Sequence, residues 1–229
     1  MKLGLILATG IALIAAPAAA SFTIGTKTGA NCYPFGCSDG NAPGDRYQQA
    51  YNAAAFSGGP VLLTSMSFEM VLAMTSPPDL KSGTFQLSLS TWTGAMGTLD
   101  ETDFDGNLGA DNMVVWTGPL SSAFDGTKLS FSIAPFLYDP SMGNLLLDVS
   151  VTGGASLDYF TFFAADYLED GTFNRISNYE LNQTNRLWGL VTTFNGGAVV
   201  PEPATWGMLI VGFGIVGSMA RRRRLSATA

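Results

Sequence analysis

Four segments of the chain have their apolar residues at every second position. They are residues 62–72, 85–89, 129–133 and 145–151, in which Leu, Phe, Met, Ile and Val alternate with mostly polar residues. Successive side chains of a β-strand point to opposite faces of a sheet, so this alternation predicts strands with one buried face.

Weaker patterns of the same kind predict further strands near residues 113–117, 158–164 and 187–194. Between the segments at 129–133 and 145–151 lies Asp-Pro-Ser-Met-Gly at 139–143, whose proline and glycine favour a tight connection. We therefore expect these two strands to form a β-hairpin.

No long segment of residues 21–200 has the 3.6-residue period of an amphipathic helix. Many short strands separated by frequent turns are typical of two sheets packed face to face. The sequence thus predicts an all-β fold for residues 21–200, an antiparallel two-layer sandwich of jelly-roll type.

The N-terminus has the features of a secretory signal peptide. Lys2 precedes an apolar run at 3–14, and Ala18-Ala19-Ala20 fits the small-residue cleavage pattern before Ser21. We expect signal peptidase to remove residues 1–20, because the apolar run is too short to span a bilayer.

The C-terminus predicts a single membrane span. Residues 204–220 contain no charge and make about 25 Å of helix, near the lower limit for crossing a bilayer. The arginines that follow would hold the tail, residues 225–229, in the cytoplasm. The segment as a whole, residues 201–224, combines proline, tryptophan, glycine and arginine elements in a fixed order: Pro201, Glu202, Pro203, Trp206, Gly212, Gly214, Arg221, Arg222, Arg223 and Arg224.

This order resembles the PEP-CTERM sorting signal that exosortases of Gram-negative bacteria recognise. It is similar to the variant in which Trp-Ala-Met follows Pro-Glu-Pro after two residues, with Gly207 in place of the alanine. Residues 136–149 also resemble a stretch common in the exported domains of such proteins. The resemblance implies an inner-membrane protein with a periplasmic domain, which an exosortase cleaves and passes to the cell surface or extracellular matrix. It further implies a non-enzymatic role linked to exopolysaccharide and biofilm.

The exported region is strongly acidic. Residues 21–200 contain six basic and seventeen acidic residues, a net charge of −11. Such a domain has no electrostatic footprint for nucleic acid, and it is repelled by anionic lipid or acidic polysaccharide unless a cation bridges them.

Cys32 and Cys37 are the only cysteines, and they lie among turn-forming residues. In an exported protein they predict a local disulfide. With no histidine in the chain, a tetrahedral zinc site has no imidazole or third thiolate to complete it.

The absence of histidine also removes the Ser-His-Asp and Cys-His forms of nucleophile activation. A secreted polysaccharide-active enzyme that uses paired carboxylates remains as the alternative, although the sequence selects no pair. A carbohydrate-binding module is a further alternative, in which aromatic faces stack on sugar rings or else fill the core: Trp92, Trp116, Trp188, Tyr167 and Tyr179.

The densest acidic cluster lies at residues 100–111. Asp103, Asp105 and Asp111 are hard oxygen ligands in a glycine-containing loop, although their spacing only partly fits a calcium loop. We expect no resident cofactor, with calcium at this loop as the one candidate and a solvated surface loop as the alternative.

Overall fold

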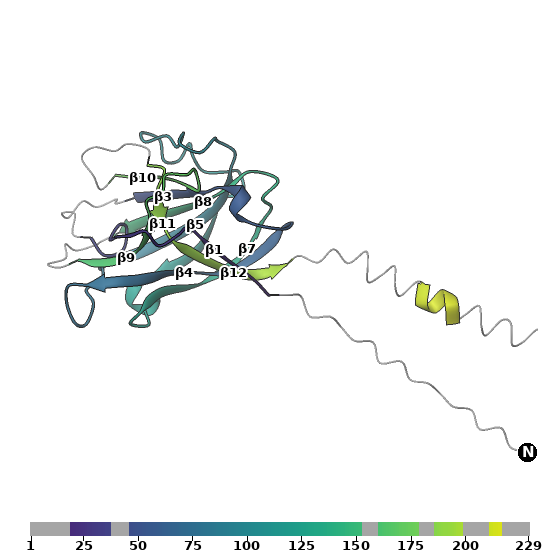
Figure 1. Ribbon diagram of the computed structural model, residues 1–229, viewed down its shortest axis with the longest axis horizontal. Coiled ribbons are helices and arrows are strands. Elements are labelled where there is room, and N and C mark those ends of the chain that lie inside the picture. The colour runs from purple at the N-terminus through teal and green to yellow at the C-terminus, as the bar shows by residue number, and fades with distance from the viewer. Residues whose placement is uncertain (1–18, 38–45, 153–159, 179–185, 199–210, 217–229) are drawn as a thin grey trace, which may run out of the picture. The chain divides into compact units, whose positions relative to one another are not determined.

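The computed structural model describes residues 19–37, 46–152, 160–178, 186–198 and 211–216. It divides the chain into a unit that ends at Ala198 and a second unit that begins at Val199. In the first unit, the described residues form almost entirely antiparallel β-structure (Figure 1).

The larger sheet has seven strands and is built around a long central strand, β4 (Val61–Ala73). One edge of β4 pairs with β7 (Lys128–Tyr138), and the other edge pairs first with β12 (Thr192–Ala198) and then with β9 (Thr161–Asp166). Three shorter strands complete the sheet: β1 (Ala19–Ile24) on β12, and β2 (Gly29–Asn31) and β11 (Gly189–Leu190) on β9.

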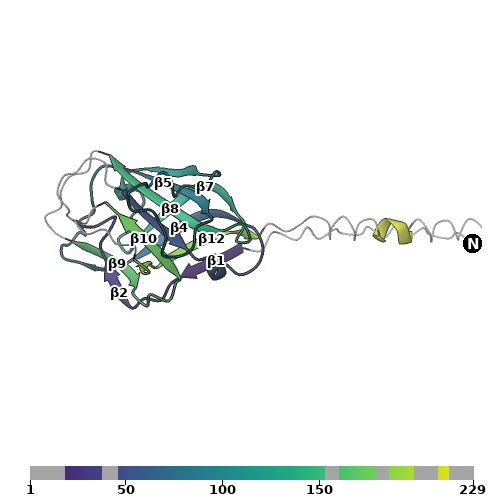
Figure 2. The same cartoon turned by 90° about the horizontal axis from the view of Figure 1, so that it is seen from above.

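The smaller sheet has five strands in the order β10-β3-β8-β5-β6. Its strands are β3 (Arg46–Tyr51), β5 (Thr84–Trp92), β6 (Met113–Gly118), β8 (Asn144–Thr152) and β10 (Phe173–Ser177). Two single-turn 3-10 helices, η1 (Ala53–Ala55) and η2 (Leu120–Ser122), lie in the connections. Figure 1 shows the sheets as two layers, and in Figure 2, seen from above, strands of one layer overlap those of the other. The predicted antiparallel β class is confirmed.

The predicted hairpin at residues 129–151 is wrong. β7 pairs with β4 in the larger sheet, whereas β8 pairs with β3 and β5 in the smaller one. The turn at 139–143 therefore carries the chain from one layer to the other, and Tyr138 Oη donates a hydrogen bond to the carbonyl of Gly143 across it. Both strands alternate because each has one face in the same core. The alternation alone does not show whether two such strands pair with each other or lie in opposite sheets.

The core between the sheets is rich in aromatic side chains, and Phe35 lies among them. Its ring is 5.0 to 6.1 Å, between centroids, from rings of both sheets: Phe68, Phe131 and Phe163 in the larger sheet and Phe85 in the smaller. Phe35 belongs to the short loop closed by the Cys32–Cys37 disulfide, which spans 4.9 Å between Cα atoms. The disulfide loop thus places an aromatic anchor in the core.

Three buried polar side chains of β3 and β12 also connect the layers. Gln49 accepts a hydrogen bond from the backbone N–H of Leu190 at 2.7 Å and donates one to its carbonyl at 3.0 Å. Tyr51 Oη lies 2.8 Å from the hydroxyl of Thr192. Burial raises the pKa of Tyr51 far above its usual range, and its phenol therefore stays protonated.

Replacing Phe35 with alanine should lower the free energy of unfolding by about 3 to 5 kcal/mol, because the side chain is fully buried and leaves a cavity. Urea denaturation followed by tryptophan fluorescence measures this change. Leu72→Ala is the control, since Leu72 is 53% exposed and should change stability by less than about 0.5 kcal/mol. Equal losses for the two variants would contradict the role of Phe35 as a core anchor.

Candidate functional site

Only part of the predicted sorting segment lies among the residues that the structure describes. Residues 211–216 form a helical turn and a half in which Gly212 and Gly214 are exposed, and a Cβ at either glycine would meet nothing within 4 Å. The other predicted sorting residues, Pro201, Glu202, Pro203, Trp206 and Arg221 to Arg224, lie outside the described residues, as do residues 1–18 of the predicted signal peptide. In the part of the chain that the structure describes, no helix is long and apolar enough to cross a membrane.

A polar cluster on the outer face of the smaller sheet is centred on Arg46, the first residue of β3. Its Nε and Nη2 donate to the two oxygens of Asp148 at 2.8 and 3.2 Å, and its Nη1 donates to Asp105 at 2.7 Å. The Cζ of Arg46 also lies 5.5 Å from the ring centroid of Phe104. Burial alone would lower the pKa of Arg46, but the hydrogen bonds to the two carboxylates outweigh it and raise the pKa.

The two carboxylates around Arg46 differ in their surroundings. Asp148, on the neighbouring strand β8, is buried and also accepts a hydrogen bond from Gln48 at 3.0 Å. Asp105 belongs to the acidic loop, and its side chain is 81% exposed. Arg46 and Asp148 are not recognisable as site residues from the sequence, because only the register of β3 against β8 brings them together.

The acidic loop packs on the sheet. Phe104 and Leu108 of the loop pack against a second, smaller apolar cluster that includes Leu146 and Ile176 of the sheet's outer face. Asn107 of the loop donates to the side chain of Gln48 at 2.9 Å. In turn, Gln48 donates to the carbonyl of Phe104 at 2.8 Å.

The carboxylates proposed for calcium each bind a different donor. Asp103 accepts from the N–H of Gly106, Asp105 from Arg46, and Asp111 from the N–H and hydroxyl of Thr91. Within the described residues, no three carboxylate or thiolate side chains come close enough together to hold a metal ion. Asp103, Asp105 and Asp111 are thus not gathered into one ligand set, and the calcium site stays a prediction.

The same loop shows what its carboxylates do instead. Asp100 accepts hydrogen bonds from the hydroxyl and N–H of Thr102 and from the N–H of Asp103, which lower the pKa of Asp100. Accepted hydrogen bonds of this kind stabilise turns and satisfy backbone donors. These hydrogen bonds give the carboxylate of Asp100 a structural role in the loop that needs no metal ion.

The aromatic candidates for sugar stacking fall into two groups. Trp92 is buried, and Trp116 is half-buried with its ring edge-on to Phe131, so both belong to apolar clusters. Tyr167 and Trp188 form a surface pair with ring centroids 4.5 Å apart, and Tyr167 is 41% exposed. Tyr179 lies outside the described residues.

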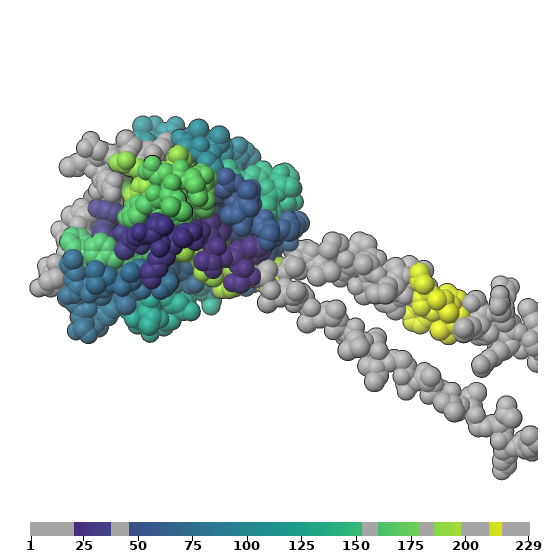
Figure 3. Space-filling view, in the orientation of Figure 1, coloured from purple at the N-terminus to yellow at the C-terminus, as the bar shows by residue number. Residues whose placement is uncertain are grey.

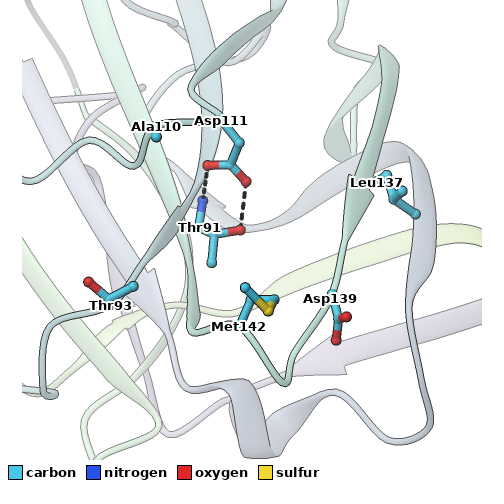
Figure 4. A pocket seen from close by; sticks show the side chains of 7 residues that line it. All are labelled: Thr91, Thr93, Ala110, Asp111, Leu137, Asp139 and Met142. Atoms are coloured by element: carbon cyan, nitrogen blue, oxygen red, sulfur yellow. Dashed lines mark hydrogen bonds between the residues drawn. The ribbon is translucent and has the colours of Figure 1, made fainter.

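Two open hollows adjoin the acidic loop. One, of about 300 Å³, runs along the outer face of the smaller sheet beside Arg46 and is lined mostly by polar residues: Arg46, Gln86, Ser88, Asp105, Leu108, Asn112, Val114, Asp148 and Ser150. The other, of about 390 Å³, lies between Asp111 and the turn after β7, with Leu137, Asp139 and Met142 on one side and Thr91 on the other (Figure 4).

The comparison with known families identifies the C-terminal segment. The family model of the PEP-CTERM protein-sorting motif matches residues 199–224. No curated protein matches the chain, and neither does any solved structure. The chain therefore carries a PEP-CTERM protein-sorting motif, which implies export, membrane anchoring and processing by an exosortase.

Removing Asp148 should cost much more stability than removing Asp105, although both bind Arg46. Asp148→Ala leaves buried donors of Arg46 and Gln48 without an acceptor and should lower the free energy of unfolding by about 3 kcal/mol. Asp105→Ala removes an exposed ion pair and should cost less than about 1 kcal/mol. Urea denaturation of the two variants measures both values, and similar losses would show that the buried cluster does not stabilise the fold.

Proposed function

We propose that this protein is an exported surface or extracellular-matrix protein that an exosortase cleaves near Pro201-Glu202-Pro203. The sorting motif at residues 199–224 is the observation that carries the proposal. In this reading Trp206 and Gly207 belong to the Pro-Glu-Pro-x-x-Trp-Gly-Met variant, and residues 204–220 anchor the chain until cleavage. The arginines at 221–224 keep the tail in the cytoplasm.

On this proposal, the processed protein has a structural role that is linked to extracellular polysaccharide. Two observations support a non-enzymatic reading. The chain has no histidine, and the buried carboxylate nearest the polar hollow, Asp148, is occupied as the acceptor of three hydrogen bonds. A carboxyl group that serves as a general acid must instead donate a proton.

Mass spectrometry of the form recovered from the cell surface tests the processing. The expected mass lacks the apolar segment and the arginines at 221–224. Glu202→Ala should leave the chain in the membrane fraction, whereas Thr205→Ser, at a variable position of the same motif, should be processed normally. A surface form that retains Arg221 to Arg224 would overturn the proposal.

Carbohydrate binding in the polar hollow is a second candidate, favoured by its mixture of planar polar side chains with Leu108 and Val114. Gln86 and Asn112 line it and are exposed. If a glycan binds there, Gln86→Ala and Asn112→Ala should each weaken affinity about fivefold, the loss of about one hydrogen bond. Affinity electrophoresis in gels that contain the producer's exopolysaccharide measures this change.

Thr64→Ala is the control for this measurement, since Thr64 is exposed on β4 in the other sheet. Equal migration of all the variants, with and without polysaccharide, would contradict binding in the hollow. Release of new reducing ends from the same polysaccharide would instead favour the enzymatic alternative with paired carboxylates.

A further inference from the structure

Four strands of the larger sheet begin or end where the folded domain passes into the sorting segment. In the pairing register, Gly197 of β12 lies between Leu62 of β4 and Ala19 of β1, which the predicted cleavage before Ser21 would remove. Leu62 in turn lies beside Leu137 of β7. These residues belong to the start of β1, the end of β12, the start of β4 and the end of β7. The last strand that the structure describes, β12, ends one residue later, at Ala198.

This end of the sheet exposes apolar side chains, which we name the Leu62 patch: Leu62, Leu137 and Met142. They are 38%, 57% and 65% exposed. Leu137 and Met142 line one side of the hollow in Figure 4, and a Cβ at Gly197 would meet nothing within 4 Å. The patch is therefore open to solvent in the isolated domain.

Two carboxylates lie beside the Leu62 patch, and both are hydrogen-bonded within the domain. Asp139 accepts hydrogen bonds from the N–H and hydroxyl of Ser141, and Asp111, across the hollow from Leu137 and Met142, accepts them from the N–H and hydroxyl of Thr91. The exported region as a whole has a net charge of −11. Burial of apolar side chains at this end must therefore outweigh the repulsion between its carboxylates and any anionic lipid.

The tether to the membrane is short. Five residues, 199–203, separate Ala198 from the first residue of the uncharged segment at 204–220. Fully extended, the six steps between Ala198 and Ala204 span at most about 20 Å. While the chain is anchored, the end of the domain that carries the Leu62 patch therefore stays close to the bilayer.

We propose that the Leu62 patch rests on the outer leaflet of the inner membrane until the sorting segment is cut. The inference rests on the proposed anchoring of residues 204–220. Burial of Leu62, Leu137 and Met142 among lipid headgroups and upper acyl chains removes apolar surface from water. Cleavage beyond Ala198 removes the tether, and the patch then leaves the membrane with the domain.

Depth-dependent fluorescence quenching tests this contact. The full-length chain, purified from membranes of a host without exosortase, is reconstituted into phosphatidylcholine vesicles that contain a lipid with a spin label high on its acyl chain. A bimane probe is attached through Leu62→Cys or Val71→Cys. These positions have matched exposure, 38% and 39%, but lie nine residues apart on β4, about 30 Å along the strand.

Quenching should be at least threefold stronger at position 62 than at position 71. A second matched pair, Leu137→Cys and Leu72→Cys at 57% and 53% exposure, should show the same difference. Vesicle flotation of each labelled protein separates the anchoring of residues 204–220 from the docking of the Leu62 patch. A chain that floats with vesicles but is quenched equally at both ends is anchored without docking, which overturns this inference alone, whereas a chain that does not float overturns the anchoring as well.

Discussion

A buried glutamine joins the two sheets just before β12, the strand that holds β1 and the C-terminal end of the domain. Gln49 of the smaller sheet holds the backbone of Leu190 through two hydrogen bonds, and β12 begins two residues later. The approach is so close that a Cβ at Gly189 would lie 2.6 Å from the Gln49 side-chain oxygen. A buried amide is costly when it lacks hydrogen-bond partners, so this contact also favours one position of Leu190 over the smaller sheet.

That contact explains how the first and last strands are held. In the described residues β1 pairs with β12 alone, along residues 19–24 and 192–197, and it forms the edge of the sheet at the surface of the domain (Figure 3). β12 in turn pairs with the central strand β4. The chain that follows the predicted signal peptide and the chain that precedes the sorting motif therefore lie side by side.

The sequence predicted the strands that have one buried and one solvated face. β7 and much of β4 alternate clearly because their outer faces meet water. β5 and β8 alternate because their core-facing residues are apolar, although Ser88 and Ser90 of β5 and Asp148 of β8 are buried on the outer face. β3 and β10 were missed because both of their faces are buried, and β3 buries Gln48 and Gln49 through hydrogen bonds that only the folded chain provides. The polar cluster was missed for a related reason, since Arg46, Asp105 and Asp148 are distant in sequence. The sorting motif was found because its recognition depends on the local order of residues, and the jelly-roll type of the fold stays a prediction.

The pairing of β1 with β12 has a consequence for the order of assembly. A polypeptide is exported from its N-terminus, so β1 reaches the far side of the membrane first and its only described partner arrives last. The larger sheet cannot close until residues 192–198 have crossed, and by then the apolar segment at 204–220 follows within a few residues. Completion of the fold would thus coincide with arrival of the proposed anchor segment, and a chain truncated before β12 would leave its first strand as an open edge available to other strands.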